Sequence, residues 1–237
     1  MNSEQLELQE LYDELLSRKN EGLSRRVRIF MWKATVRSSY ALKRFIDIVV
    51  SAGALVCLAP LFALTALAIR LESRGPVFFS QIRVGRDGKQ FKFYKFRSMR
   101  KDAEACKAAL MTQNESKDGV IFKMKNDPRI TRTGRFIRKF SIDELPQLWN
   151  VLVGDMSLVG PRPPVPSEVA LYTLEERKRL NAIPGLTCLW QIKGRSDIPF
   201  KEQVRLDTEY ILTRGFWNDL KILVRTPLAI LSGKGAY

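Results

Sequence analysis

Two adjacent carboxylates, Asp143 and Glu144, follow a strongly basic stretch of the chain. The cations before them lie at Arg129, Arg132, Arg135, Arg138 and Lys139. Such cations would attract a polyanionic substrate, and positive neighbours keep a carboxylate ionised. An ionised carboxylate beside Mg²⁺ can act as the nucleophile of a phosphoryl transfer. We therefore interpret the acid pair as a candidate catalytic site for a phosphorylated substrate.

The same acids also fit a purely structural role. Pro146 is tolerated in the first turn of a helix, so we expect a helix to begin near Glu144 or Leu145. Asp143 would then lie at or beside the N-cap, and Ser141 with Glu144 would form a capping box. The N–H groups of a helix start also favour a bound phosphate. Spacing alone leaves both capping and catalysis open.

Four further cations are candidates for binding a phosphorylated substrate. Arg162 stands in the loop "GPRPP" (160–164), where prolines on both sides lower the entropy cost of aiming its side chain. A guanidinium suits two-pronged contact with phosphate oxygens. Arg195 follows a glycine in "QIKGRS", while Lys95 and Arg97 share one face of a predicted strand. The alternatives are a polyproline-like connector for the loop and solvated cations on the strand.

Composition narrows the classes of function. The chain has 237 residues, with 40 Lys and Arg against 25 Asp and Glu, a net charge of +15, and no histidine. The charge predicts an anionic partner, which could be nucleic acid, an anionic membrane leaflet or a phosphorylated substrate. Without histidine, a Ser-His-Asp triad or a His-ligated metal site is excluded. No Walker-type or GxGxxG motif occurs. Because the cations are scattered beside acids without a recognition motif, we expect no nucleic-acid partner.

An uncharged apolar run extends from Ile48 to Ile69. Its length is close to the roughly 20 residues that span a bilayer core, but Pro60 in its middle predicts a kink. Basic residues flank the run on both sides: Lys43, Arg44, Arg70 and Arg74. Since basic flanks stay on the cytoplasmic side, a bent helix that enters and leaves by one face fits best. A crossing helix and a buried helix of a soluble protein stay open.

The remaining pattern divides the chain into three predicted parts. Residues 1–42 read as an amphipathic helix with an acidic face followed by a basic, aromatic stretch, suited to a membrane surface or to peripheral packing. Residues 43–74 hold the bent membrane helix. Residues 75–237 are expected to form one small α+β catalytic domain.

Within that domain, one hairpin and several helices are expected. Two strands within residues 77–99 surround a turn at Asp87-Gly88. Helical patterns cover 100–113, 167–183, 200–212 and 217–233. The predicted class is therefore α+β with one dominant hairpin.

Several segments together resemble the bacterial sugar transferase family. They are "KRFIDI…AP" (43–60), "FFSQIRVGRDGKQFKFYKFRSM" (78–99), "FKMKNDPRITRTGRFIRKFSIDELPQLWNVLVGDMSLVGPRP" (122–163), "PGLTCLWQIKGRS" (184–196), "LDTEY" (206–210) and the ending "GAY". The resemblance covers roughly residues 40–237, and the block 122–163 is the most specific part. Its members are the monotopic polyprenyl-phosphate phosphoglycosyl transferases that begin exopolysaccharide and O-antigen assembly.

The resemblance implies where such a protein lies. It would sit on the cytoplasmic face of the bacterial inner membrane, held by a re-entrant helix kinked at Pro60. Lys43 and Arg44 would flank that helix at the lipid headgroups, and amphipathic interfacial helices would surround the catalytic domain. Membrane lipids would thus be partners of the protein, and a homodimer is possible.

The resemblance also implies a mechanism. Asp143 would attack the sugar-bearing phosphorus of a UDP-sugar with Mg²⁺ bound at this residue, and UMP would leave. Undecaprenyl phosphate would then take the phosphosugar from the enzyme. Glu144 would assist as a metal or proton-handling partner. Arg138 and Arg162 would bind phosphate, and Arg195 the nucleotide side.

The wording of the motifs and the "GAY" ending favour galactose or glucose as the sugar, with an N-acetylated sugar as the alternative. A non-catalytic scaffold of an envelope assembly complex is the alternative from another class. The chain departs from the family pattern at Cys188, where many relatives have Gly, and at Ala59-Pro60, where Ser-Pro is common. Neither departure involves the acid pair.

Overall fold

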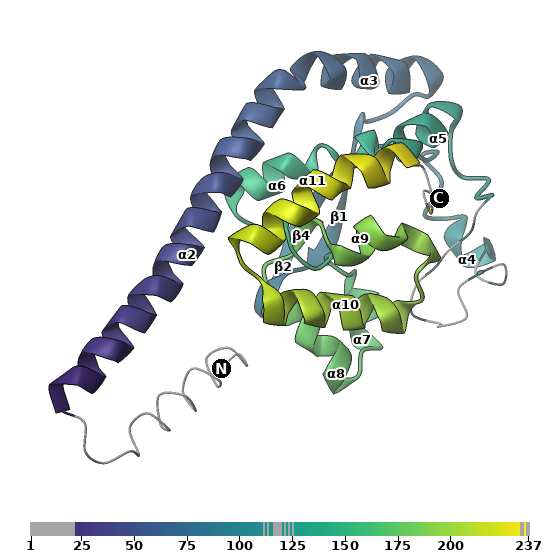
Figure 1. The fold of residues 1–237 in the computed structure, drawn as a ribbon. Helices are drawn as coiled ribbons and strands as arrows, with labels where there is room; N and C mark the ends of the chain where they lie inside the picture. The colour runs from purple at the N-terminus through teal and green to yellow at the C-terminus, as the bar shows by residue number, and fades with distance from the viewer. Residues whose placement is uncertain are drawn as a thin grey trace.

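The computed structural model describes residues 22–110, 112, 114, 115, 120, 122, 124, 126–232 and 235. The acidic helix predicted before residue 20 lies outside these residues. Among the described residues, helices α2 and α3 pack on a body that contains two small sheets and further helices of varied length (Figure 1). The elements before the acid pair are α2 (Gly22–Cys57), α3 (Ala59–Glu72), β1 (Phe78–Val84), η1 (Arg86–Gly88), β2 (Gln90–Phe96), α4 (Lys107–Leu110) and α5 (Arg132–Lys139).

The elements from the acid pair onward are η3 (Ile142–Glu144), α6 (Gln147–Val153), β3 (Ser157–Val159), α7 (Pro166–Ala170), α8 (Leu174–Arg177), η4 (Lys178–Asn181), β4 (Gly185–Thr187), α9 (Leu189–Lys193), η5 (Arg195–Asp197), α10 (Phe200–Thr213) and α11 (Phe216–Ser232). The α+β class predicted from the sequence is confirmed. Helix α2 runs without a break through the predicted boundary between residues 42 and 43.

The apolar run forms two helices that meet at a bend. The segments Ser38–Cys57 and Ala59–Glu72 are inclined by 58°, and Figure 1 shows α3 turning across the top of the body. Pro60 stands in the first turn of α3, where its missing N–H costs least. No single helix among the described residues has the length and apolar composition of a membrane span, whereas this bent pair together does.

Helix α3 is tied to the body at its C-terminal end. Ile69 is buried against Phe96 of β2 and Ile137 of α5. Glu72 accepts the first N–H groups of α5, from Arg132 at 2.7 Å and Thr133 at 2.9 Å. A carboxylate at a helix N-terminus is favourable because the N–H groups there have no partner within the helix. These contacts place the bent pair beside the segment that leads to the acid pair.

The predicted hairpin is confirmed. β1 and β2 pair in antiparallel register from Phe78↔Phe96 to Val84↔Gln90. Asp87 and Gly88 both have positive φ, as a tight hairpin turn requires. Phe79 pairs with Lys95, so Phe79, Gln81 and Arg83 lie on the same face of the hairpin as Lys95.

A second, parallel pair of strands was not predicted. β3 and β4 have three residues each and pair Ser157↔Gly185 and Val159↔Thr187. Their residues join the main apolar core, which includes Val151 of α6, Leu206 of α10 and Ile222 of α11. The loop with Arg162 follows directly after β3, and Pro163 within it is fully buried.

The single helix predicted over 167–183 is wrong. The chain instead forms α7, α8 and η4, because Thr173 begins a new helix: its side chain accepts the Glu176 N–H, and Glu176 accepts the Thr173 N–H. The helices predicted over 200–212 and 217–233 are confirmed as α10 and α11.

Candidate active site

The acid pair lies on a sharp turn between two helices. Ser141 has a left-handed backbone with φ of 54° and is followed by the short helix η3, which contains both Asp143 and Glu144. Helix α6 begins only after Pro146. The capping box predicted from Ser141 and Glu144 is wrong, because the Ser141 hydroxyl does not cap a helix and instead accepts a hydrogen bond from Arg195.

Two cations from distant segments meet at Glu144. Lys95 of β2 places its Nζ 2.6 Å from Glu144 Oε1, and Arg162 places Nη1 3.3 Å from the same oxygen. Lys95 Nζ also lies 3.7 Å from Asp143 Oδ2. The side chains of Asp143, Glu144 and Lys95 are only 8%, 16% and 18% exposed. The turn, β2 and the proline-rich loop therefore build one buried charge cluster.

The two acids differ in their pKa. Burial raises the pKa of Asp143, and the charge of Lys95 opposes this only in part. Burial also acts on Glu144, but the charges and hydrogen bonds of Lys95 and Arg162 outweigh it and hold the pKa of Glu144 well below its usual range. Lys95 and Arg162, rather than the basic stretch before the acid pair, therefore keep Glu144 ionised.

A cavity of about 500 Å³ opens onto the cluster, a volume within the usual range of small-molecule sites. Of the predicted substrate-binding residues, Lys95, Arg138, Arg162 and Arg195 line it. Arg195 has a left-handed backbone with φ of 54°, and its contact with Ser141 ties its loop to the turn that carries the acids.

Three other predicted residues are placed elsewhere. Arg97, predicted to bind substrate, follows the last residue of β2 and is directed at the end of α3, where it donates to Ser73 O at 2.7 Å. The structure does not bring it to the cavity. Lys43 and Arg44, predicted to lie at lipid headgroups, contact Val159 and the end of α6 within the protein. Their charged groups therefore donate hydrogen bonds to backbone carbonyls of the protein.

Sequence reasoning missed one wall of the cavity. Phe79, Gln81 and Arg83 line it from β1. Arg83 Nη1 donates to Pro163 O at 3.0 Å, and burial lowers its pKa to about 10. The signal was present, because residues at every second position of a strand share a face, and the hairpin register places Phe79 opposite Lys95.

The donor set at the turn fits a magnesium ion that arrives with substrate. Among the described residues, no donor lies within hydrogen-bond distance of the Asp143 carboxylate, whose nearest cation is Lys95 at 3.7 Å. The described chain also contains no group of three or more His, Cys, Asp or Glu side chains that could enclose a metal. Mg²⁺ commonly binds through one or two carboxylates together with substrate phosphates.

Comparison with known proteins identifies the family. The profile of the family "Bacterial sugar transferase" matches residues 38–233. The chain is 49% identical over 197 residues to the galactosyl transferase CpsE of Streptococcus agalactiae serotype III, an alignment covering 82% of this chain and 43% of that protein. It is 45% identical over 207 residues to an undecaprenyl-phosphate galactose phosphotransferase of Salmonella typhimurium, covering 85% and 43%.

A third relative is similar in length. The chain is 37% identical over 198 residues to the exopolysaccharide production protein ExoY of Sinorhizobium fredii, covering 82% of this chain and 88% of that protein. By contrast, it spans less than half of the streptococcal and Salmonella relatives. The matched region includes the acid pair, the bent helix pair and every described cavity-lining residue except Gly235, and the chain belongs to the bacterial sugar transferase family.

Proposed function

We propose that this chain transfers a hexose 1-phosphate from a UDP-sugar to undecaprenyl phosphate, releasing UMP and beginning the assembly of a surface polysaccharide. The observation that carries the proposal is the acid pair in its cavity. Asp143 is buried without a hydrogen-bond donor among the described residues, and beside it Glu144 is held ionised by Lys95 and Arg162. Relatives named undecaprenyl-phosphate galactose and glucose phosphotransferases support the substrate class.

The reaction runs in two displacements at phosphorus. In the first, an oxygen of the Asp143 carboxylate bonds to the sugar-bearing phosphorus, the bond from this phosphorus to the bridging oxygen breaks, and UMP leaves with the electron pair. In the second, a phosphate oxygen of undecaprenyl phosphate attacks the same phosphorus and the carboxylate is regenerated. Each step depends mainly on positioning and on the stabilisation of negative charge.

The cavity residues supply that stabilisation. Arg162 and Arg138 would contact the phosphates of the donor, and Arg195 the nucleotide side. Lys95, which lies between the two acids, stabilises Asp143 in the anionic form that attacks. Glu144 holds Lys95 and Arg162 in place through short contacts. Asp143 would hold a Mg²⁺ that accompanies the donor, and this ion would neutralise phosphate charge.

The acceptor is a lipid, so the proposal includes attachment to the cytoplasmic face of the bacterial inner membrane. The bent pair α2 and α3 would enter and leave by one face, with residues 43–74 as the membrane part and residues 75–237 as the catalytic part. Exposed apolar side chains on α2 and α3, among them Val56, Leu64 and Leu71, would contact lipid. The relatives' names favour galactose or glucose over an N-acetylated sugar.

The test is to trap the covalent intermediate. Purified protein is incubated with UDP-galactose or UDP-glucose and Mg²⁺ without undecaprenyl phosphate, and the intact mass and peptide masses are measured. We expect a hexose phosphate on Asp143 and UMP in solution, and no adduct with Asp143→Asn. Asp102→Asn is the matched control, because Asp102 is exposed and pairs with Arg100 outside the cavity. Release of UDP, or an adduct that survives Asp143→Asn, would rule the mechanism out.

A further inference from the structure

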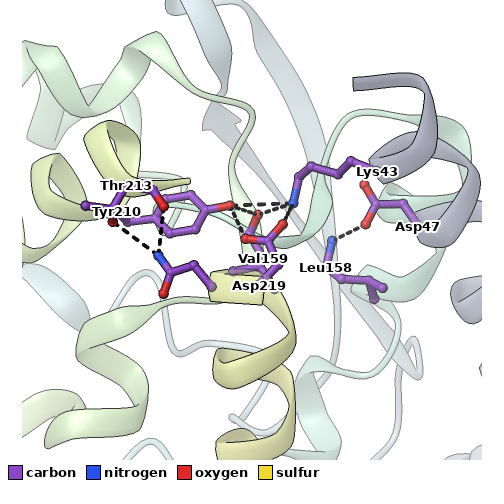
Figure 2. A network of polar contacts seen from close by, with 8 residues as sticks. Lys43, Asp47, Leu158, Val159, Tyr210, Thr213 and Asp219 are labelled. Atoms are coloured by element: carbon purple, nitrogen blue, oxygen red, sulfur yellow. Dashed lines mark hydrogen bonds and ion pairs between the residues drawn. The ribbon is translucent and has the colours of Figure 1, made fainter. Parts of the chain in front are cut away.

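One face of α2 holds the end of strand β3. Lys43 and Asp47 lie one helical turn apart, so they point the same way. Asp47 Oδ1 accepts the N–H of Leu158 at 3.0 Å, and Lys43 Nζ donates to the carbonyl of Val159 at 3.2 Å. Figure 2 shows both side chains reaching from α2 to these consecutive backbone groups. The position of β3 along α2 is thereby defined by two contacts.

Residues of α10 and α11 complete the network from the other side. The Tyr210 hydroxyl lies 3.0 Å from Val159 O and 2.9 Å from Asp219 Oδ1, while Lys43 forms an ion pair with Asp219 (Figure 2). Burial, and then the charge of Asp219, raises the pKa of Tyr210, so its hydroxyl keeps its proton and remains a donor. The Val159 carbonyl thus accepts from Lys43, and it shares the single proton of the Tyr210 hydroxyl with the Asp219 carboxylate.

The segment after Val159 leads directly to the active-site arginine. The Gly160 N–H donates to Thr187 O of β4 at 3.0 Å, and Pro161 has a restricted φ. Arg162 is the next residue, and its guanidinium contacts Glu144. Only two residues with little backbone freedom therefore separate the tied carbonyl from Arg162.

Helix α2 also contacts the other element that carries the site. Arg44 donates to the last-turn carbonyls of α6, at 2.6 Å to Val151 O and 2.7 Å to Leu152 O. A cation is favourable there because the C-terminal carbonyls of a helix have no partner within the helix. The acid pair lies just before α6, so successive residues of α2 hold the segments on both sides of the charge cluster.

We propose that Lys43 and Tyr210 are positioning residues. Through the Val159 carbonyl, they link the position of α2 on the catalytic body to the position of Arg162 relative to Glu144. This inference rests on the proposed function, since Arg162 is taken there as a phosphate-binding residue. It gives the membrane helix a second role, because a change in the seating of α2 would displace the Val159 carbonyl and with it the loop 160–164.

The test combines Tyr210→Phe with Arg162→Met. Tyr210→Phe removes one hydroxyl and keeps the ring, and we expect it to slow adduct formation per folded enzyme by about tenfold, as small misplacements do. In an Arg162→Met background the same change should cost less than about twofold, because its effect passes through Arg162. Equal slowing in both backgrounds, or no slowing in the native background, would overturn the inference.

A second measurement does not depend on catalysis. Hydrogen exchange of the peptide covering 157–160 is followed in donor-free protein, and we expect Tyr210→Phe to speed it. Thr213→Val is the matched control, since its hydroxyl donates to Glu209 O and does not reach β3. Unchanged hydrogen exchange of this peptide in Tyr210→Phe would show that Tyr210 does not hold the end of β3. If the native protein formed no adduct, the proposed function would fail while this measurement still decided the tie.

A second variant, which alters the partner of Lys43 and Tyr210 instead of Tyr210 itself, keeps the test valid if Tyr210→Phe does not fold. Asp219→Asn keeps the size of the side chain and removes the charge that pairs with Lys43. We expect Asp219→Asn to slow adduct formation in the native background but not in the Arg162→Met background. We also expect faster hydrogen exchange of the peptide covering 157–160. A native rate and native exchange in folded Asp219→Asn would count against the inference.

Discussion

At the scale of single residues, the site places two neighbouring carboxylates in different electrostatic environments. Lys95 and Arg162 both reach the same oxygen of Glu144, whereas the cation closest to the Asp143 carboxylate among the described residues is Lys95 at 3.7 Å, beyond hydrogen-bond distance. Glu144 is therefore the stable anion that orders the cations. Asp143 keeps its lone pairs available for a phosphorus atom or a metal ion, at the cost of a raised pKa.

This arrangement predicts a specific pH dependence. Because the proposed nucleophile is the anion of Asp143 and burial raises the pKa of this group, the rate of adduct formation should fall as the pH drops through that pKa. Lys95→Met removes the strongest influence that lowers this pKa, so the acid limb should move to higher pH by about one unit or more. Rapid-quench measurements of adduct formation across pH would show the shift.

Lys92→Met provides the control for this prediction. Lys92 lies on the same strand but is exposed, and only its backbone carbonyl contacts Asn150. Its acid limb should match that of the native protein. A Lys95→Met limb that stayed in place, or moved to lower pH, would show that Lys95 does not govern the charge of Asp143.

At the scale of elements, the parallel contact of β3 and β4 depends on two glycines. A Cβ on Gly160 would lie 2.4 Å from Ile183 O, and a Cβ on Gly185 would lie 2.0 Å from Gly160 N. Both contacts are to backbone atoms, which cannot rotate away. The close approach brings β3 against β4 and so positions the loop from which Arg162 contacts Glu144.

Gly160→Ala and Gly185→Ala should therefore lower the free energy of unfolding, each by about 1–3 kcal/mol or more, as overpacking does. Denaturant unfolding in detergent, followed by tryptophan fluorescence, would measure the loss. Gly215→Ala should be close to neutral, because nothing lies within 4 Å of its added Cβ. Native stability in both strand variants would mean that the two strands are not in such close contact.

At the scale of the whole molecule, exposed apolar side chains gather on elements around the bent helix pair. Figure 1 shows α5, α6 and α11 on the side where α3 crosses, and α8 on the opposite side. Large exposed apolar residues on α5, α6 and α11 are Phe136, Trp149, Val153, Trp217, Val224, Leu228 and Leu231. Such a surface beside a bent apolar pair fits contact with a lipid interface.

Leu228→Asp should weaken binding to vesicles by about tenfold or more, because burying a leucine side chain contributes about 1.5–3 kcal/mol. Co-flotation with vesicles containing anionic lipids measures the bound fraction. Leu174→Asp is the matched control: Leu174 is 85% exposed, more than Leu228 at 68%, but stands on α8. Equal loss in the two variants would exclude α11 as part of a lipid-contacting face.

Local features of the fold could be predicted from the sequence because their causes lie within a few residues. The Asp87-Gly88 turn needs two positive φ values, the bend follows the missing N–H of Pro60, and the apolar period of α10 defines its length. The capping box at Thr173 is equally local, but it lies within a stretch whose apolar pattern also fits one continuous helix. Residue type and spacing singled out the acid pair as a candidate site and left capping and catalysis open.

Contacts between distant segments depend on how the elements pack, and the sequence pattern could not predict them. Lys95 meets Glu144 across 49 positions and Arg195 meets Ser141 across 54, while Lys43 reaches Asp219 across 176. Periodicity cannot specify which cation reaches which acid, because that depends on how α2, the hairpin and β3 pack on one another. For this reason the sequence could predict the bend and single out the acid pair as a candidate, whereas packing alone assigned Lys95 to the acids, Arg97 to the end of α3, and Lys43 to strand β3.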